Sequence, residues 1–275
     1  MSLRINSNIA SITAQRYLDK TQRQVDSSFK ALASGSRLSS PQNDAAGFAI
    51  SELLRAQVAG LDQSGHNARS AQALIQTAEG GLNEQNNILV RMRELAVNSA
   101  SDTIGDKERG FVNEEFQLLT NEFDRISKAT RFGTKSLLTG SGEDFSFQVG
   151  PNKGEDNVIK FKLDANTTAS NSGIDGLDIS DKGGAVDALG AIDEAVSHVS
   201  GVRARLGGVQ SRFQYASDNL DVQKQNVEEA RSMIADVDVA EETSKLARAQ
   251  VLQQSGLAVL AQANSFPKTL LRLIE

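Results

Sequence analysis

The last third of the chain carries apolar residues that recur at every seventh position. This series, the returning seam, consists of Ile192, Val199, Leu206, Phe213, Leu220, Val227 and Ile234. The positions three residues later are also mostly apolar, as Ala195 and Val202 show. A pattern of this period and length predicts a long helix that packs lengthwise against other helices.

A second heptad series lies nearer the N-terminus and complements the first. Its members, the outgoing seam, are Leu54, Leu61, Ala68, Ile75, Leu82, Leu89 and Ala96. Because a long stretch of other sequence separates the two seams, we expect the chain to run out, turn and return. The predicted fold class is mainly α, a long antiparallel helical coiled-coil rod.

The N-terminal segment, residues 4–34, is predicted to be an amphipathic helix. Its apolar positions include Ile5, Ile9, Ile12, Val25, Phe29 and Leu32. Gly35 is well placed to end this helix in the left-handed conformation. Asp44 is a favourable N-cap for the next helix, which we expect to end near Ser99. A shorter amphipathic helix is expected after Gly105.

The C-terminal segment, residues 239–263, is predicted to be the final helix. Its apolar positions include Leu246, Leu252, Leu257 and Leu260. We expect Pro267 to break the helix, because proline lacks the backbone N–H. Neither terminal helix has enough partners to bury its apolar stripe alone, and soluble monomers avoid large exposed apolar surfaces. We therefore expect the two to pair with one another and with copies from neighbouring subunits.

The hydrophobic period changes to two in the middle of the chain. The alternating apolar residues are Phe145, Phe147 and Val149, then Ile159, Phe161 and Leu163 after a turn at Pro151. This pattern predicts a β-hairpin over about 144–164. The following residues, about 166–184, are rich in Asn, Thr, Ser, Gly and Asp and are predicted to form a surface loop.

The pattern breaks divide the chain into two expected domains. The terminal helices form a discontinuous domain, 1–42 with 237–275. The helical domain between them, 43–236, contains the hairpin and the loop.

The composition excludes several classes of function. The 275 residues include no cysteine, which removes disulfides, thiolate nucleophiles and cysteine metal sites. The net charge of −6 argues against a nucleic-acid partner, which requires clustered Lys and Arg. We expect no membrane insertion, since no apolar run is long enough to span a bilayer. The N-terminus also lacks the pattern of a secretory signal.

Candidate catalytic groups are few. The two histidines, His66 and His198, are far apart in the sequence and are interpreted as ordinary residues on helix surfaces. The acidic pairs at 228–229 and 241–242 diverge, since adjacent helical residues point about 100° apart. The glycine pairs at 80–81 and 207–208 fit no phosphate loop, and close approach of helices is the favoured explanation for both. We therefore expect no enzyme activity, no metal and no cofactor.

Several segments near both ends of the chain resemble bacterial flagellin, the subunit of the flagellar filament. They are RINSN at 4–8, LASGSRLSS at 32–40, DAAGFAI at 44–50, NNILVRMRELAV at 86–97, ARAQVLQQSG at 247–256 and LAQAN at 260–264. Together they follow the order of the family and cover both ends. The chain resembles a short flagellin without the outer variable domains.

The resemblance implies a function, a location and a set of partners. Flagellins leave the cell unfolded through the flagellar type III pathway and polymerise into a hollow extracellular filament for motility. The terminal helices then line the inner tube. The implied partners are further copies, paralogous flagellins, an export chaperone, the filament cap and hook-associated proteins. Sheathed and periplasmic filaments stay open, and so do the O-glycosylation sites within 166–180.

Three residues resemble the flagellin surface that a vertebrate toll-like receptor recognises. Arg91 and Leu95 are four residues apart and share one helical face, and Glu115 comes from the next helix. Packing between subunits is the alternative role of the same residues.

Two rival functions follow from the same pattern. A hook–filament junction protein of the same machine has similar terminal helices. A type III translocator that contacts host membranes requires a long apolar hairpin, and the sequence contains none.

Overall fold

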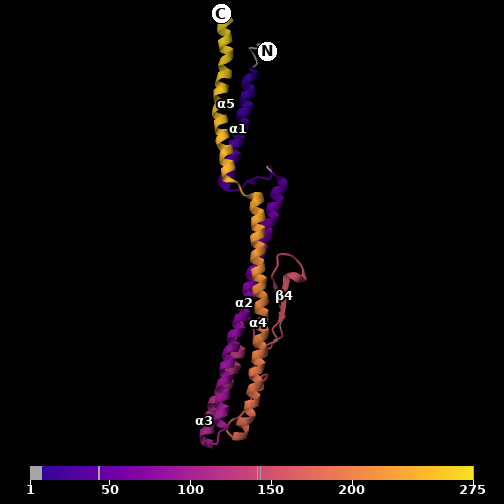
Figure 1. The fold of residues 1–275 in the computed structure, drawn as a ribbon, viewed down its shortest axis with the longest axis vertical. Helices are drawn as coiled ribbons and strands as arrows, with labels where there is room; N and C mark the ends of the chain where they lie inside the picture. Colours follow the sequence, from indigo (N-terminus) through magenta and orange to yellow (C-terminus); the bar gives the residue numbers. More distant parts are fainter. Residues whose placement is uncertain (1–7, 43, 141, 143, 275) are drawn as a thin grey trace. The chain divides into compact units, whose positions relative to one another are not determined.

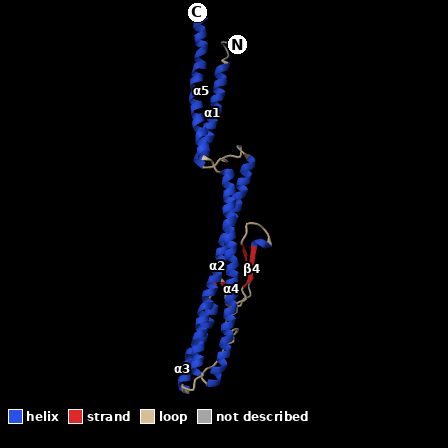
Figure 2. Ribbon diagram, in the orientation of Figure 1, coloured by secondary structure: helices blue, strands red, loops and turns tan. Residues whose placement is uncertain are grey.

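The computed structural model describes residues 8–42, 44–140, 142 and 144–274, with side chains described up to residue 265. Its helices are α1 (Ile9–Ser34), α2 (Ala45–Ser99), α3 (Asp106–Ala129), α4 (Lys182–Ala235) and α5 (Val239–Ile274) (Figure 1). The strands fall between α3 and α4 in the sequence (Figure 2). They are β1 (Arg131–Phe132), β2 (Lys135–Ser136), β3 (Asp144–Gln148) and β4 (Val158–Lys162), with a 3-10 turn at Glu155–Asn157.

The chain folds into two compact units. The terminal unit comprises Met1–Gln57 and Asn226–Glu275, and the central unit comprises Val58–Gln225. Both boundaries between units lie inside the long helices α2 and α4. The division into domains at residues 42 and 237 stays a prediction.

In the central unit, α2 and α4 pack against each other in opposite directions. Three ion pairs join them: Arg93 with Asp193, Glu79 with Arg203, and Asp62 with Lys224. The residue number rises on one helix as it falls on the other, which confirms the predicted antiparallel, mainly α fold. The core between the helices includes Ala68, Ile75, Leu82, Leu89 and Ala96 from α2 and Ile192, Val199, Leu206 and Phe213 from α4.

The predicted hairpin is confirmed as the antiparallel pair β3–β4. Phe145 lies opposite Phe161 and Phe147 lies opposite Ile159. The ring of Phe147 meets that of Phe213 on α4 edge to face, with centroids 5.6 Å apart. Aromatic contacts of this geometry add to the free energy gained by burial. They fix the hairpin on α4. The short pair β1–β2, which the hydrophobic pattern did not indicate, precedes it.

The segment between β4 and α4, residues 163–181, is an irregular strap that packs against the helices. The loop predicted at about 166–184 is irregular only up to residue 181, and several of its side chains are buried and not at the surface. The side chains of Thr167, Ile174 and Ile179 are all 0% exposed. Helical side chains bond to the strap backbone in place of a neighbouring strand. Gln85 Nε2 donates to the Thr167 carbonyl at 3.0 Å, and Gln117 Nε2 donates to the Leu177 carbonyl at 2.7 Å. These bonds let an irregular segment be buried without losing its polar partners.

In the terminal unit, Gly35 ends α1 as predicted, with a φ of 68°. The N-cap is Asn8, which accepts a hydrogen bond from Ser11 N and lies inside the predicted helix 4–34, so the helix starts later than expected. Asp44 Oδ1 accepts from Gly47 N at 2.9 Å, as expected for the N-cap of α2. The predicted break at Pro267 is wrong, since α5 continues to Ile274. A proline removes one helical hydrogen bond, and here the helix tolerates that loss.

Candidate functional site

Helices α1 and α5 lie side by side and antiparallel in the terminal unit (Figure 1). Small side chains form the interface: Ser28 and Ala31 on α1 and Ala249 on α5 are buried. Polar bonds cross it, from Ser11 Oγ to Asn264 Oδ1 at 2.7 Å and from Gln253 to Gln22. The two helices therefore pack closely through small and polar side chains.

Much of the apolar stripe on this helix pair stays exposed. The side chains of Ile9, Ile12, Phe29, Leu252 and Leu257 are each between 50% and 65% exposed. Val25, Leu32, Leu246 and Leu260 are half-buried. Ile5, which was predicted to share this stripe, lies outside the described residues. Large apolar areas of this kind mark surfaces that other proteins cover.

The returning seam continues into the terminal unit with less burial. Leu220 is buried at the end of the central unit, whereas Val227 and Ile234 are only half-buried. Tyr17 on α1 and Met233 on α4 are exposed in the same unit. The terminal unit thus exposes apolar side chains from several helices.

In the terminal unit, the segment that follows α1 and the segment that links α4 to α5 are hydrogen-bonded to each other. Arg37 N donates to the Ala235 carbonyl at 2.8 Å, and Val237 N donates to the Gly35 carbonyl at 3.1 Å. The Arg37 guanidinium also donates to the Ile234 carbonyl at 2.8 Å. The Ile234 and Ala235 carbonyls belong to the last turn of α4, whose acceptors lack partners within the helix. Arg37 therefore caps α4, a role that the sequence pattern did not reveal.

The structure brings Arg91 and Glu115 together on the surface of the central unit. Arg91 Nη2 lies 2.8 Å from Glu115 Oε1, and Arg91 Nη1 lies 3.0 Å from Glu94 Oε2. The hydrogen bonds that Arg91 donates to Glu115, and then to Glu94, raise the pKa of its guanidinium above the ordinary value. Leu95 is only 5% exposed and belongs to the core of the central unit. The expectation that Leu95 belongs to an accessible surface is corrected accordingly.

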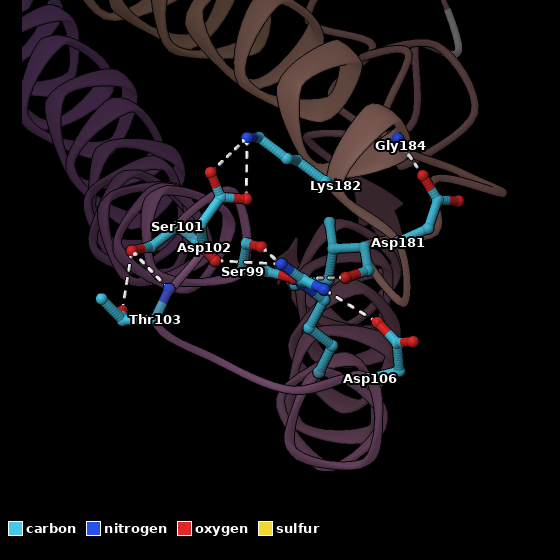
Figure 3. A network of polar contacts seen from close by, with 10 residues as sticks. Ser99, Ser101, Asp102, Thr103, Asp106, Asp181, Lys182 and Gly184 are labelled. Atoms are coloured by element: carbon cyan, nitrogen blue, oxygen red, sulfur yellow. Dashed lines mark hydrogen bonds and ion pairs between the residues drawn. The ribbon is translucent and has the colours of Figure 1, made fainter.

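A polar network joins the ends of α2, α3 and α4 (Figure 3). Arg109 is buried and donates to the carbonyls of Ser99 and Ser101, both at 2.9 Å, and to Asp106 Oδ1 at 2.8 Å. Lys182 Nζ lies 2.8 Å from Asp102 Oδ1. The Lys182 ammonium lowers the pKa of the Asp102 carboxyl. Arg109 thus satisfies the last carbonyl of α2 and the Ser101 carbonyl in the following turn, and it fixes the start of α3.

The described residues contain no group of three or more His, Asp or Glu side chains that could hold a metal ion. Within that same part of the chain, none of the helices combines the length and hydrophobicity needed to cross a bilayer. The acidic pair at 241–242 binds Lys245, with Nζ 2.8 Å from Glu241 Oε1. The features that remain for a function are the exposed helix pair and the central surface at Arg91.

Comparison with known families decides the identity of the chain. Residues 5–143 match the model of the bacterial flagellin N-terminal helical region, and residues 189–274 match that of the C-terminal helical region. This chain belongs to the flagellin family. It is a structural subunit of the bacterial flagellar filament and not an enzyme. Flagellins polymerise with themselves, and the filament that they form is extracellular.

Curated flagellins are similar over their full length. A flagellin of Halalkalibacterium halodurans is 40% identical over 272 residues, which are 98% of this chain and 99% of that protein. A Bacillus subtilis flagellin is 34% identical over 99% of this chain and 100% of that protein. Flagellin A of Vibrio cholerae aligns over 379 positions against the 275 residues here. This chain is accordingly a short form that lacks residues present in longer flagellins.

Solved structures agree on the fold. A Bacillus cereus flagellin crystal structure superposes with a TM-score of 0.51 at 24% identity, covering 56% of this chain and 88% of that one. A Vibrio parahaemolyticus structure assigned to a flagellar hook-associated protein gives a TM-score of 0.61 at 14% identity, covering 70% and 99%. The second likeness shows a shared fold only, and the full-length relatives favour a filament subunit over a junction protein.

Proposed function

We propose that the α1–α5 pair is the polymerisation element of this flagellin and lines the inner tube of its filament. The observation that carries the proposal is the exposed apolar stripe, with Ile12, Phe29 and Leu257 each at least 50% exposed. Flagellins assemble with copies of themselves, so a second copy of this chain is the occupant that fits. Burial of apolar surface stabilises such contacts by roughly 25 cal/mol per Å².

The capping of α4 by Arg37 supports this proposal. The hydrogen bonds from Arg37 to Ala235 and from Val237 to Gly35 tie the end of α1 to the end of α4. The α1–α5 pair then begins from a fixed backbone position within the terminal unit. A fixed starting point reduces the entropy that assembly has to overcome.

Removal of either terminal helix tests the proposal. Deletion of residues 1–34 or of residues 239–275 is expected to abolish filament growth, measured by sedimentation and electron microscopy. The central unit should keep its helical circular dichroism, because its core lies within residues 58–225. Normal filaments from either shortened chain would contradict the proposal.

Single substitutions give a sharper test. Ile12→Asp and Leu257→Asp place a charge where an apolar contact is proposed, and each is expected to raise the critical concentration for growth at least about tenfold, or about 1.4 kcal/mol. Gln15→Asp and Gln254→Asp add the same charge at exposed polar positions of α1 and α5 and are the matched controls. Equal effects at apolar and control positions would show that charge alone matters.

The proposal extends to the specific partners of the subunit and to its export and location. The chain is expected to cross the flagellar type III pathway unfolded, escorted by an export chaperone, and to assemble under the filament cap above hook-associated proteins. Paralogous flagellins are expected to co-polymerise. The short form predicts a thin, smooth filament. Electron microscopy of native filaments tests this: micrometre-long polymers support a filament subunit, and polymers that stop near the hook support a junction protein.

We also propose that the depolymerised subunit is recognised by a toll-like receptor through Arg91 and Glu115. Their ion pair holds both side chains, each about half exposed, on one surface of the central unit. Arg91→Ala and Glu115→Ala are expected to weaken receptor activation by the monomer, while Arg125→Ala, which removes an exposed arginine of another ion pair on α3, is the control. Unchanged activation would leave packing between subunits as their role.

A further inference from the structure

Both ends of the Asn8 side-chain amide are bonded. Oδ1 accepts from the backbone N–H of Ser11 at 3.0 Å and caps the N-terminus of α1. Nδ2 donates to the backbone carbonyl of Ala263 on α5 at 2.7 Å. One half-buried side chain therefore starts one terminal helix and contacts the backbone of the other.

The Ala263 carbonyl differs from the other carbonyls of α5. In an α-helix each carbonyl accepts from the N–H four residues later, and the residue four after Ala263 is Pro267. Proline has no N–H to donate. Helix α5 nevertheless continues through this position to Ile274. The amide of Asn8 supplies a donor where the helix cannot.

This match is specific to one register of the two helices. Pro267 is the single proline in the sequence of α5, so Ala263 offers the one carbonyl whose donor proline has removed. Sliding α1 along α5 would aim Nδ2 at carbonyls that already accept from their own helix. It would also leave the Ala263 carbonyl without this donor, and an unpaired backbone acceptor is costly once buried.

We infer that Asn8 is a positioning residue that sets the register of α1 on α5, and that it does so through the acceptor that Pro267 frees. The inference rests on the proposal that the α1–α5 pair is the polymerisation element. It makes two residues 259 positions apart energetically coupled through the Ala263 carbonyl. In the assembled tube, the register of this pair decides which apolar side chains each subunit presents to its neighbours.

A double-mutant cycle in the full-length chain tests the coupling. Asn8→Ser keeps an N-capping oxygen but is too short to reach Ala263, and Pro267→Ala restores the missing N–H. Asn8→Ser is expected to raise the critical concentration for filament growth about tenfold in the parent chain and less than about twofold in the Pro267→Ala chain.

Ser11→Ala is the matched control for this cycle. It removes the neighbouring bond from Ser11 Oγ to Asn264 Oδ1, which does not involve the carbonyl freed by Pro267. Ser11→Ala is expected to change the critical concentration for filament growth by the same factor in the parent chain and in the Pro267→Ala chain. An Asn8→Ser effect of equal size in both backgrounds, or no effect in the parent, overturns the inference.

A measurement on unsubstituted filaments keeps the inference testable if variants fail to assemble. Solid-state NMR of filaments carrying ¹⁵N in asparagine side chains and ¹³C in alanine carbonyls should show a dipolar contact between Asn8 Nδ2 and the Ala263 carbonyl. Absence of that contact overturns the inference and leaves the proposed function intact. Growth of chains shortened at either terminus would instead overturn the proposed function.

Discussion

Gly80 and Gly81 are neighbours in α2 but have different surroundings. A Cβ on Gly81 would lie 2.5 Å from Thr130 Oγ1 and 2.9 Å from Leu138 Cδ1, whereas a Cβ on Gly80 would meet nothing within 4 Å. Close approach thus explains Gly81, although its neighbours lie just after α3 and β2 and not on a packed helix as predicted. It is wrong for Gly80 and for the pair at 207–208, where space is also open. At the residue scale, the tertiary neighbour and not the residue type decides the role.

Alanine substitutions at these two positions should change stability in opposite directions. Gly80→Ala is expected to stabilise the chain by about 0.5–1 kcal/mol through helix propensity. Gly81→Ala is expected to destabilise it by about 1–2 kcal/mol, because Thr130 and Leu138 must move. Urea unfolding followed by circular dichroism measures both, and equal shifts for the two variants would contradict this explanation.

Two exposed aspartates should make stability depend on pH in the acid range. Hydrogen bonds from Lys182 and Arg93 lower the pKa of Asp102 and Asp193, respectively, below the ordinary value near 4. A lowered folded-state pKa means that the contribution is fully present above the unfolded pKa and is lost as pH falls through the folded one. Asp102→Asn with Asp193→Asn should therefore flatten the decline of thermal stability below about pH 4. If the thermal stability of this variant fell with pH as steeply as that of the parent, Asp102 and Asp193 would not be the source of the pH dependence.

At the scale of elements, the strap at 163–181 depends on helical side chains for its hydrogen bonds. Gln85 is fully buried at a heptad position of α2, three residues after Leu82. Its Nε2 donates to the carbonyls of Phe123 on α3 and Thr167 on the strap. A polar residue at such a position fixes the register of packed elements at some cost in stability. Gln85 thus aligns α2, α3 and the strap.

Gln85→Met preserves length and volume but removes the donor. We expect it to destabilise the chain by about 2 kcal/mol, because the Phe123 and Thr167 carbonyls lose a buried donor. Gln76→Met, at an exposed position of the same helix, is the control and should change stability by less than about 0.5 kcal/mol. Chemical denaturation measures both, and a neutral Gln85→Met would show that the bonds do not hold the strap.

At the scale of the whole molecule, the two units are stabilised in different ways. The central unit has a continuous core that includes Phe116, Phe123 and Phe213, all 0% exposed. The terminal unit buries few side chains at the α1–α5 contact and leaves Ile9 and Phe29 exposed. We expect this unit to reach its full stability only when neighbouring subunits cover its apolar surface.

Limited proteolysis should reveal this difference. In the depolymerised chain, protease is expected to cleave first within α1 and α5, leaving a resistant fragment that contains 58–225, because local opening follows from few buried contacts. In assembled filaments the same sites should be protected by at least tenfold in rate. Mass spectrometry of the fragments identifies the cleavage sites, and early cleavage within α3 would contradict the expectation.

The sequence by itself determined the helices, the hairpin and the family. Heptad spacing in residues such as Ile192 and Val199, the caps at Gly35 and Asp44, and the alternation around Phe145 are local signals that need no knowledge of distant contacts.

Only the tertiary structure decided which distant groups meet. It showed that the strap at 163–181 buries several of its side chains, that Leu95 lies in the core, and that α5 continues past Pro267 while Asn8 bonds to Ala263. These features depend on the register between elements far apart in the chain. Register is set by the sum of many packing and hydrogen-bond contacts, which no local pattern encodes.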